Sequence, residues 1–283
     1  MVKIIGDTTS GLSAEVAEQY GIPIIPQVIT FGDKSYLEGL EIDNATFMTK
    51  LQASETLPKT AAPPPELFAK EFKALSATGK TAICILPSAV VSGTVRSATV
   101  AARNFPNLDI RIIDTQVVGS PVATLLRLAG KWAEAGLDAE AIEKRIYDYT
   151  ARCRVYFLVD TLEYLAKGGR IGGAAALLGS VLQLKPVLTL ERGRIESLEK
   201  IRTLKRAKQR LKELVIEQIA PGNEGHLSIM HAGVPDQAQA LADDLKRELH
   251  LPYDARIVDV PPAIVTHGGP GVLAAAFFTP RTE

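Results

Sequence analysis

Stretches of apolar, β-branched residues alternate with amphipathic stretches along the first half of this 283-residue chain. The alternation constrains the fold strongly, because strands joined by helices lie parallel in one sheet with helices on both faces. We therefore expect an α/β fold. The strands expected in this half cover residues 2–6, 22–30, 35–37, 81–86 and 110–113. Two helices are expected to begin after caps at Ser13 and Asp43. Three more are expected over residues 92–104, 117–135 and 138–152.

The second half also alternates between strands and helices but has different local signals, with two strands expected to pair around the turn Arg192-Gly193. Its expected strands cover residues 155–159, 185–190, 195–202, 226–231 and 255–260, and an expected loop at 267–271 precedes the segment 272–278. Its expected helices cover 162–167, 174–184, 203–219 and 236–249. Because a domain has roughly 150 residues, and because the pattern changes near residue 155, we predict two α/β domains, residues 1–155 and 156–283.

Composition excludes several classes of protein. The 32 basic residues balance 32 acidic ones without a long run of either sign, which is unlike a nucleic-acid-binding protein. Cys84 and Cys153 have no zinc-site or disulfide spacing, so we expect buried, reduced thiols. The first apolar run is too short for a signal peptide, and the run 174–184 is interrupted by polar residues. We expect a soluble, cytoplasmic protein that does not insert into a membrane.

Common catalytic motifs are missing from the sequence. Gly79-Lys80-Thr81 resembles the end of a phosphate-binding loop, but the first glycine of that motif would fall at Ala74, and a strand follows instead of a helix. There is no GxSxG, HExxH or CxxC motif. The usual hydrolase, zinc-protease and redox signatures are therefore absent.

Hydroxyl-rich turns follow three of the expected strands, at residues 7–10, 87–94 and 114–115. Ligands of open α/β sheets bind beyond the carboxyl ends of the strands. Ser92 lies at an expected helix N-terminus, where a hydroxyl and free backbone amides favour a carboxylate or a phosphate. The alternative is that Ser92 or Thr94 only caps its own helix, and the pattern by itself favours capping.

Three further segments have both a structural and a functional interpretation. Thr60 lies in the stiff, proline-rich segment 58–65, and His267 lies in the expected glycine-rich turn 267–271. Most residues in such places are structural, although glycine permits close approach of a ligand to the backbone. The segment 167–173 is either a helix C-cap or an exposed cationic loop for a partner or a phosphate.

Several motifs together resemble the DegV family over essentially the whole chain, in the family's order. They are Asp7-Thr8-Thr9, Pro58-Lys59-Thr60, Ser92-Gly93-Thr94 followed by Ser97-Ala98, Asp114-Thr115, Leu162-Glu163-Tyr164-Leu165 with Lys167-Gly168-Gly169-Arg170-Ile171-Gly172, Lys185-Pro186-Val187-Leu188, and His267-Gly268-Gly269-Pro270-Gly271. Each motif is weak alone, and their shared order and spacing are specific.

The resemblance implies two α/β domains with a ligand cavity between them that holds one long-chain fatty acid. It implies that Thr60 and Ser92 bind the carboxylate, with His267 and Arg202 in the supporting polar network. Family members present the acid to a separate ATP-dependent fatty acid kinase, and the loop at Arg170 resembles a segment associated with that partner. The family often has Ser-Gln after the loop threonine, whereas this chain has Ala61-Ala62.

These implications define the expected function: a lipid carrier without catalytic activity and without a cofactor. We also expect Arg170 to be exposed for the partner and Arg202 to face the pocket from a strand. Two alternatives remain. One is a serine acyl hydrolase in which Ser92 is the nucleophile, His267 the base and Asp114 the orienting acid. The other is a phosphotransferase, because a related fold occurs in dihydroxyacetone kinases.

Overall fold

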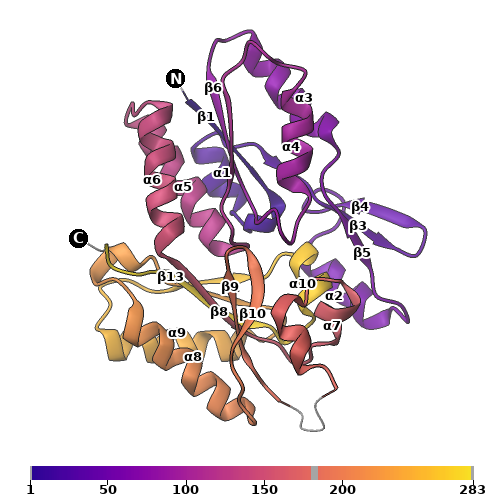
Figure 1. Ribbon diagram of the computed structural model, residues 1–283, viewed down its shortest axis with the longest axis vertical. Helices are drawn as coiled ribbons and strands as arrows, with labels where there is room; N and C mark the ends of the chain where they lie inside the picture. Colours follow the sequence, from indigo (N-terminus) through magenta and orange to yellow (C-terminus); the bar gives the residue numbers. More distant parts are fainter. Residues whose placement is uncertain (1, 180–183, 282–283) are drawn as a thin grey trace. The chain divides into compact units, whose positions relative to one another are not determined.

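The computed structural model describes residues 2–179 and 184–281, and the chain forms two compact units (Figure 1). The N-terminal unit comprises residues 1–151 and 261–263, and the C-terminal unit comprises residues 152–260 and 264–283. Each unit has its own sheet. The short helix α10 (Pro262–Gly268) begins with residues of the first unit and ends with residues of the second.

A four-stranded parallel sheet forms the centre of the N-terminal unit, as predicted. Its strand order is β2-β1-β6-β7, where the strands are β1 (Val2–Asp7), β2 (Ile24–Ile25), β6 (Thr81–Leu86) and β7 (Ile110–Asp114). Most residues of the two central strands are apolar and buried, which is typical of a parallel sheet covered on both faces.

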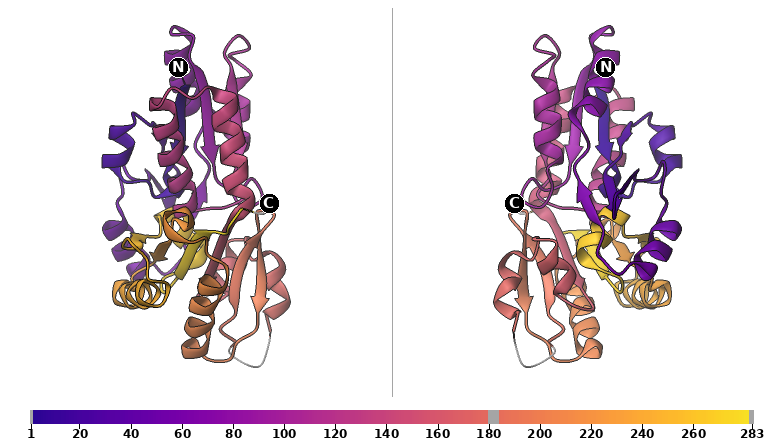
Figure 2. Two further views of the ribbon diagram at one scale, coloured as in Figure 1. Left: turned by 90° about the vertical axis from the view of Figure 1, so that its left-hand side faces the viewer. Right: turned by 90° about the vertical axis from the view of Figure 1, so that its right-hand side faces the viewer.

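Helices cover both faces of this sheet (Figure 1 and Figure 2). On one face, α3 (Pro65–Ser76) and α4 (Thr94–Ala102) bury Phe68 and Phe72 against Ile5 and the β6 residues. On the other face, Gly6 lies against Leu126 of α5 (Ser120–Glu134). The contact is so close that a Cβ added to Gly6 would lie 2.5 Å from the Leu126 side chain. Successive residues of β1 thus face opposite helices. Two further helices of this unit are α1 (Ala14–Gln19), which Ser13 caps as predicted, and α6 (Ala139–Arg152).

A small antiparallel sheet, β4-β3-β5, accompanies the parallel one. Its strands are β3 (Val28–Phe31), β4 (Lys34–Leu37) and β5 (Lys59–Ala61), and α2 (Asn44–Ala53) follows β4, with Asp43 as the predicted cap. Two predictions are wrong here. The strand expected over 22–30 divides between two sheets at Pro26, and the expected loop 58–65 contains β5, which pairs with β3.

The C-terminal unit has a six-stranded mixed sheet of order β10-β9-β8-β13-β11-β12. Neighbouring strands are antiparallel except β11 and β12, which are parallel. The strands are β8 (Cys153–Leu158), β9 (Val187–Glu191), β10 (Arg194–Glu199), β11 (Ser228–His231), β12 (Arg256–Asp259) and β13 (Leu273–Phe278). The predicted pairing of β9 with β10 around Arg192-Gly193 is confirmed.

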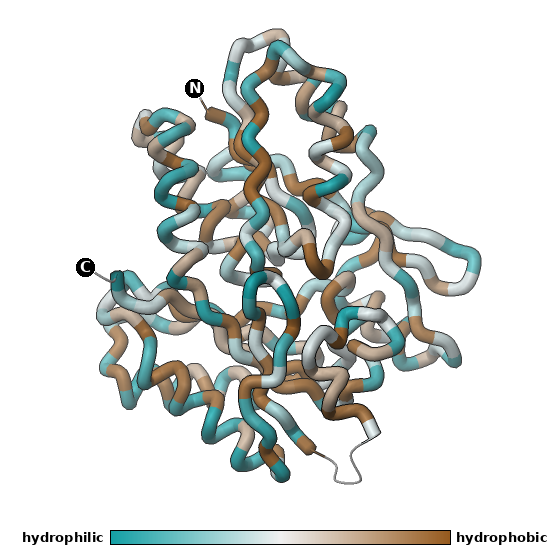
Figure 3. Tube along the Cα trace, viewed as in Figure 1, coloured by the Kyte–Doolittle hydropathy of each residue, from teal (hydrophilic) through white to brown (hydrophobic). Residues whose placement is uncertain are grey.

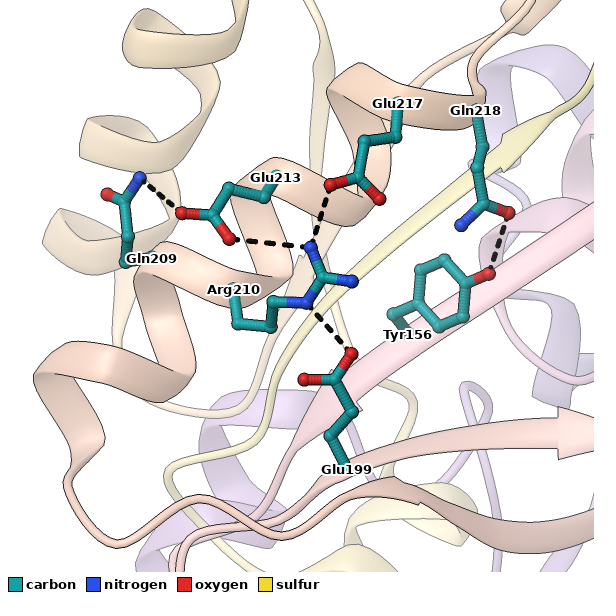
Figure 4. A network of polar contacts seen from close by, with 7 residues as sticks. All are labelled: Tyr156, Glu199, Gln209, Arg210, Glu213, Glu217 and Gln218. Carbon is teal, nitrogen blue, oxygen red and sulfur yellow. Dashed lines mark hydrogen bonds and ion pairs between the residues drawn. The ribbon is translucent and has the colours of Figure 1, made fainter.

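Two long helices, α8 (Leu204–Gln218) and α9 (Pro235–Leu249), pack on this sheet. Their residues alternate between hydrophobic and hydrophilic in Figure 3, as expected for helices with one apolar face. On α8, Arg210 forms ion pairs with Glu199 at 2.8 Å, Glu217 at 2.8 Å and Glu213 at 3.4 Å (Figure 4). The pair with Glu199 ties the helix to the end of β10.

Other parts of the C-terminal unit differ from the prediction. Instead of a helix over 174–184 there is a 3₁₀ segment at Gly172–Leu177, and Leu178 has an extended backbone. The rest of that prediction, residues 180–183, lies outside the described residues. The segment packs on β10 so closely that a Cβ on Gly172 would lie 2.1 Å from the Ile195 carbonyl oxygen. The described residues include no helix that is both long and apolar enough to cross a membrane.

Candidate functional site

The candidate site of the N-terminal unit lies at the carboxyl ends of its parallel strands. Asp7 ends β1, and the turn at Thr8–Ser10 follows it directly. The segment after β6 leads through Ser88 and Ser92 to α4. The structure therefore brings the predicted hydroxyl-rich turns to one edge of the sheet, where α/β proteins bind ligands.

Ser92 is half-buried and immediately precedes the N-cap residue of α4, Gly93. Its hydroxyl lies 2.8 Å from the Thr94 hydroxyl and accepts a hydrogen bond from the Thr94 backbone N–H at 3.3 Å. Ser92 thus satisfies one amide of the helix start, but the N-cap position itself belongs to Gly93. The interpretation of Ser92 as only an N-cap is therefore too simple.

The strand that carries Thr60 runs beside the segment that carries Ser92. Thr60 lies on β5 opposite Ile29 of β3 and is half-buried. Two residues further on, Ala62 lies close to Gly93. A Cβ added to Gly93 would lie 3.2 Å from the Cβ of Ala62. The Ser97 hydroxyl of α4 also donates to the carbonyl oxygen of Pro63. These contacts make the segments of Thr60 and Ser92 neighbours, as the ligand hypothesis requires.

A buried polar network lies behind Ser92. The Gln27 side-chain amide donates to the Thr94 hydroxyl at 2.7 Å and to the Asp7 carboxylate at 2.6 Å. The second Asp7 oxygen accepts from the Thr9 hydroxyl at 2.6 Å. Gln27, Asp7 and Thr94 are each at most 3% exposed. Sequence reasoning missed Gln27, although one amide inside the apolar run 24–29 was a signal that it has a buried polar partner.

A second buried carboxyl, Glu38, lies beside this network. It accepts from the Thr8 hydroxyl and, at 2.8 Å, from the backbone N–H of Ala263 at the start of α10. Burial raises the pKa of Glu38 to about 7, and the nearby Asp7 charge adds to this rise. Burial also raises the pKa of Asp7 to about 6, although hydrogen bonds from Thr9 and Gln27 oppose the shift. No sequence signal marked Glu38, because an acidic residue before a glycine is common in exposed turns.

His267 is the predicted site residue of the C-terminal unit, and it lies in the last turn of α10 and not in a glycine-rich loop. Its ring packs on Gly168, where a Cβ would come within 2.3 Å of the His267 Nδ1. Burial and the nearby Arg170 charge lower the pKa of His267 to about 4. His267 is therefore neutral at pH 7 and can offer an anion a neutral N–H donor rather than a positive charge.

The prediction that Arg170 is exposed is wrong. Arg170 is half-buried, and its guanidinium donates to the Gly168 carbonyl oxygen at 2.6 Å. The Arg170 N–H donates to the Leu165 oxygen and the Gly169 N–H to the Ala166 oxygen, which is the Schellman motif that ends α7 (Glu163–Lys167). The glycine-rich segment is therefore a helix C-cap, and Arg170 and His267 are brought together.

The prediction that a strand carries Arg202 is wrong, because β10 ends at Glu199 and Arg202 lies beyond it. It is exposed and immediately precedes Thr203, whose hydroxyl caps α8 by accepting from the Arg206 N–H at 3.3 Å. The structure thus groups Thr60 with Ser92 and His267 with Arg170. That Thr60, Ser92, His267 and Arg202 bind one carboxylate stays a prediction.

The hydrolase alternative gains no support from Asp114. Its carboxylate accepts hydrogen bonds from the backbone N–H groups of Gln116 at 2.9 Å and Ala89 at 3.2 Å, so it fixes two turns. A histidine with a pKa near 4 is also a weak general base at neutral pH. Among the residues that the structure describes, no group of three or more His, Cys, Asp or Glu side chains could hold a metal ion.

Known proteins with this fold share the architecture over nearly their whole length. A family model described as "Uncharacterised protein, DegV family" matches residues 1–280. A DegV domain-containing protein of Streptomyces coelicolor is 39% identical over 277 residues, 96% of each chain. Two similar solved structures, each covering 99% of both chains, are fatty-acid-binding DegV family proteins. The one from Streptococcus agalactiae has a TM-score of 0.91 and 30% identity, and the one from Thermus thermophilus has 0.90 and 28%. The chain belongs to the DegV family, a class of two-domain α/β proteins.

Asp7→Asn should change how stability depends on pH. Because the pKa of Asp7 is raised in the folded state, its contribution to stability is present below the unfolded value of about 4 and is lost as pH rises through about 6. We expect the free energy of unfolding of Asp7→Asn, relative to the unsubstituted protein, to rise by about 2 kcal/mol between pH 4 and pH 8. Urea denaturation at several pH values measures it. Asp33→Asn, in the exposed turn after β3, is the matched control; an equal rise in both variants would contradict the assignment.

Arg170→Gln should raise the pKa of His267, because it removes a nearby positive charge. NMR titration of the His267 ring protons in ligand-free protein measures this pKa. In the unsubstituted protein the shifts should stay constant from pH 8 to pH 5, whereas in Arg170→Gln they should begin to move at a higher pH. Arg206→Gln, an exposed change on α8, is the control. A His267 ring that titrates near pH 6.5 in the unsubstituted protein would show that it is not shielded from water.

Proposed function

We propose that this protein binds one long-chain fatty acid and holds its carboxylate with Thr60 and Ser92, with His267 and Arg202 as supporting residues. The observation that carries the proposal is the adjacency of the Thr60 and Ser92 segments at the carboxyl edge of the parallel sheet. Similar solved structures at 28% and 30% identity are described as fatty-acid-binding, which supports the same ligand here.

The chemistry of these residues suits a carboxylate. An ionised carboxylate removed from water costs several kcal/mol unless hydrogen bonds replace its hydration. Hydroxyl donors from Thr60 and Ser92 and the positive end of the α4 dipole offset this cost. Each buried methylene of the tail contributes about 0.8 kcal/mol. The tail therefore supplies most of the affinity, and the polar residues fix the position of the head group.

We further propose that the protein is a carrier without catalytic activity or a cofactor. In this proposal it presents the bound carboxylate to a separate ATP-dependent kinase, which forms the acyl phosphate. The family resemblance supports this step, and the engagement of Asp114 in turn hydrogen bonds favours a structural role for Asp114 over a catalytic one. A cytoplasmic location stays a prediction, as does a contact of Arg170 with the kinase.

Protein purified without added lipid should contain about one fatty acid per chain, because an empty apolar cavity is costly. Solvent extraction and mass spectrometry, normalised to protein concentration, measure the content. A lipid-free extract from well-folded protein that also fails to take up added fatty acid would refute the proposed function.

Ser92→Ala should weaken fatty-acid binding about 10- to 150-fold without unfolding the protein, because a hydrogen bond to a charged group contributes about 1.5–3 kcal/mol. Thr60→Ala should weaken it less. Competition with a fluorescent fatty acid gives both affinities, and Thr46→Ala, an exposed change on α2, is the control. If Ser92→Ala binds normally but abolishes hydrolysis of a chromogenic acyl ester, the hydrolase alternative is correct.

A further inference from the structure

The hydroxyl of Ser92 is the last member of a chain of buried hydrogen bonds. Thr94, which is 0% exposed, lies between Ser92 and Gln27. Its Oγ1 is 2.8 Å from the Ser92 Oγ and 2.7 Å from the Gln27 Nε2. The Gln27 Nε2 is in turn 2.6 Å from the Asp7 carboxylate. The chain connects the end of β1, the residue before β3 and the first residue of α4.

The direction of the Gln27 amide follows from its partners. A carboxylate only accepts hydrogen bonds, so the amide nitrogen of Gln27 faces Asp7. The two amide protons then serve Asp7 and Thr94, one each. Gln27 is also fixed at its backbone, because its own N–H donates to the Thr8 hydroxyl at 2.9 Å.

The Thr94 hydroxyl has one proton and two lone pairs. Gln27 donates to one lone pair, and the hydroxyl forms its other hydrogen bond with the Ser92 Oγ, in which either oxygen can be the donor. When the Thr94 hydroxyl donates to Ser92, the Ser92 Oγ accepts two hydrogen bonds from Thr94, one from its hydroxyl and one from its backbone N–H. The Ser92 proton must then point away from Thr94. In this arrangement Gln27 donates to Thr94 and Thr94 donates to Ser92, and each hydrogen bond strengthens the next.

We propose that Gln27 and Thr94 are positioning residues that direct the Ser92 hydroxyl proton toward an anionic head group. The inference rests on the proposed function, since it requires that Ser92 binds the fatty-acid carboxylate. Thr94 acts through Ser92 without touching the ligand, and Asp7 holds the Gln27 amide in place. A carboxylate benefits most from this arrangement, because hydrogen bonds to charged acceptors are about twice as strong as those to neutral ones.

The test is a comparison of two ligands with the same tail, hexadecanoic acid and hexadecan-1-ol. Thr94→Val keeps the shape of the side chain but removes the hydroxyl. We expect it to weaken binding of the acid about tenfold and binding of the alcohol about threefold, because the hydrogen bond to a neutral acceptor is about half as strong. Thr94→Ser, which restores the hydroxyl, should bind the acid within about threefold of the unsubstituted protein. Thr99→Val, an exposed change on the same helix, is the matched control.

A double substitution separates positioning from packing. If Thr94 acts only through Ser92, Ser92→Ala/Thr94→Val should bind the acid no more weakly than Ser92→Ala alone. Equal losses for acid and alcohol in Thr94→Val, or losses that multiply in the double variant, would overturn the inference. Thermal melts check folding. If Thr94→Val does not fold, Gln27→Asn, which withdraws the amide from Thr94 by one methylene, is measured in its place with the same expected selectivity.

The outcomes also distinguish this inference from the function on which it rests. If the unsubstituted protein binds no fatty acid, or if Ser92→Ala binds it normally, the proposed function or its site is wrong. If Ser92→Ala selectively loses the acid while Thr94→Val and Gln27→Asn do not, the carrier function stands and the positioning role fails.

Discussion

The N-terminal unit depends on how it accommodates the carboxyl of Asp7, which is fully buried at the end of the central strand β1. A buried carboxyl is costly unless its oxygens have hydrogen-bond partners. Thr9 and Gln27 supply them at 2.6 Å each. Gln27 precedes β3 of the small antiparallel sheet, which pairs with the strand of Thr60. One buried group thereby fixes the mutual positions of the parallel sheet and the segments that carry Thr60 and Ser92.

In the C-terminal unit, closely packed glycines, and not a buried carboxyl, determine how neighbouring segments lie against each other. Gly168 lets the His267 ring lie against the end of α7, and Gly172 lets the 3₁₀ segment lie on β10. A side chain at either position would collide with a neighbour. The same packing buries the His267 ring and keeps Arg170 near it, and both effects lower the pKa of His267, so the ring is neutral at pH 7. These glycines allow neighbouring segments to pack closely, which is a more specific role than making a loop mobile.

Much of the fold could be predicted from local sequence. Strand β6 occupies the predicted residues 81–86, because an uninterrupted apolar run there is bounded by Lys80 and Pro87. Asp43 marked the start of α2 through its capping chemistry. The short strand β5 could not be predicted, because three residues beside prolines become a strand only by pairing with β3. The division of 22–30 at Pro26 and the 3₁₀ segment at Gly172 depend on tertiary contacts in the same way.

The candidate site was predictable to a different degree. Ser92 and the strand-end turns could be found, because chemistry at the carboxyl ends of parallel strands follows from topology. The placement of Arg170 and His267 was predicted wrongly, because burial depends on which elements pack together and not on the glycines beside them. Glu38 and the role of Gln27 were missed for the same reason: a hydrogen bond between residues 27 and 94 joins segments 67 residues apart.

The central claim is that the Ser92 hydroxyl binds an ionised carboxylate sheltered from water. NMR of the bound fatty acid, labelled with ¹³C at its carboxyl carbon, tests this directly. The claim predicts one bound resonance whose chemical shift is constant from pH 8 to pH 5, because hydrogen bonds to the anion hold the carboxyl pKa below that range. It also predicts that Ser92→Ala moves this resonance. A bound carboxyl that titrates as it does in water, with a shift unaffected by Ser92→Ala, would contradict the claim.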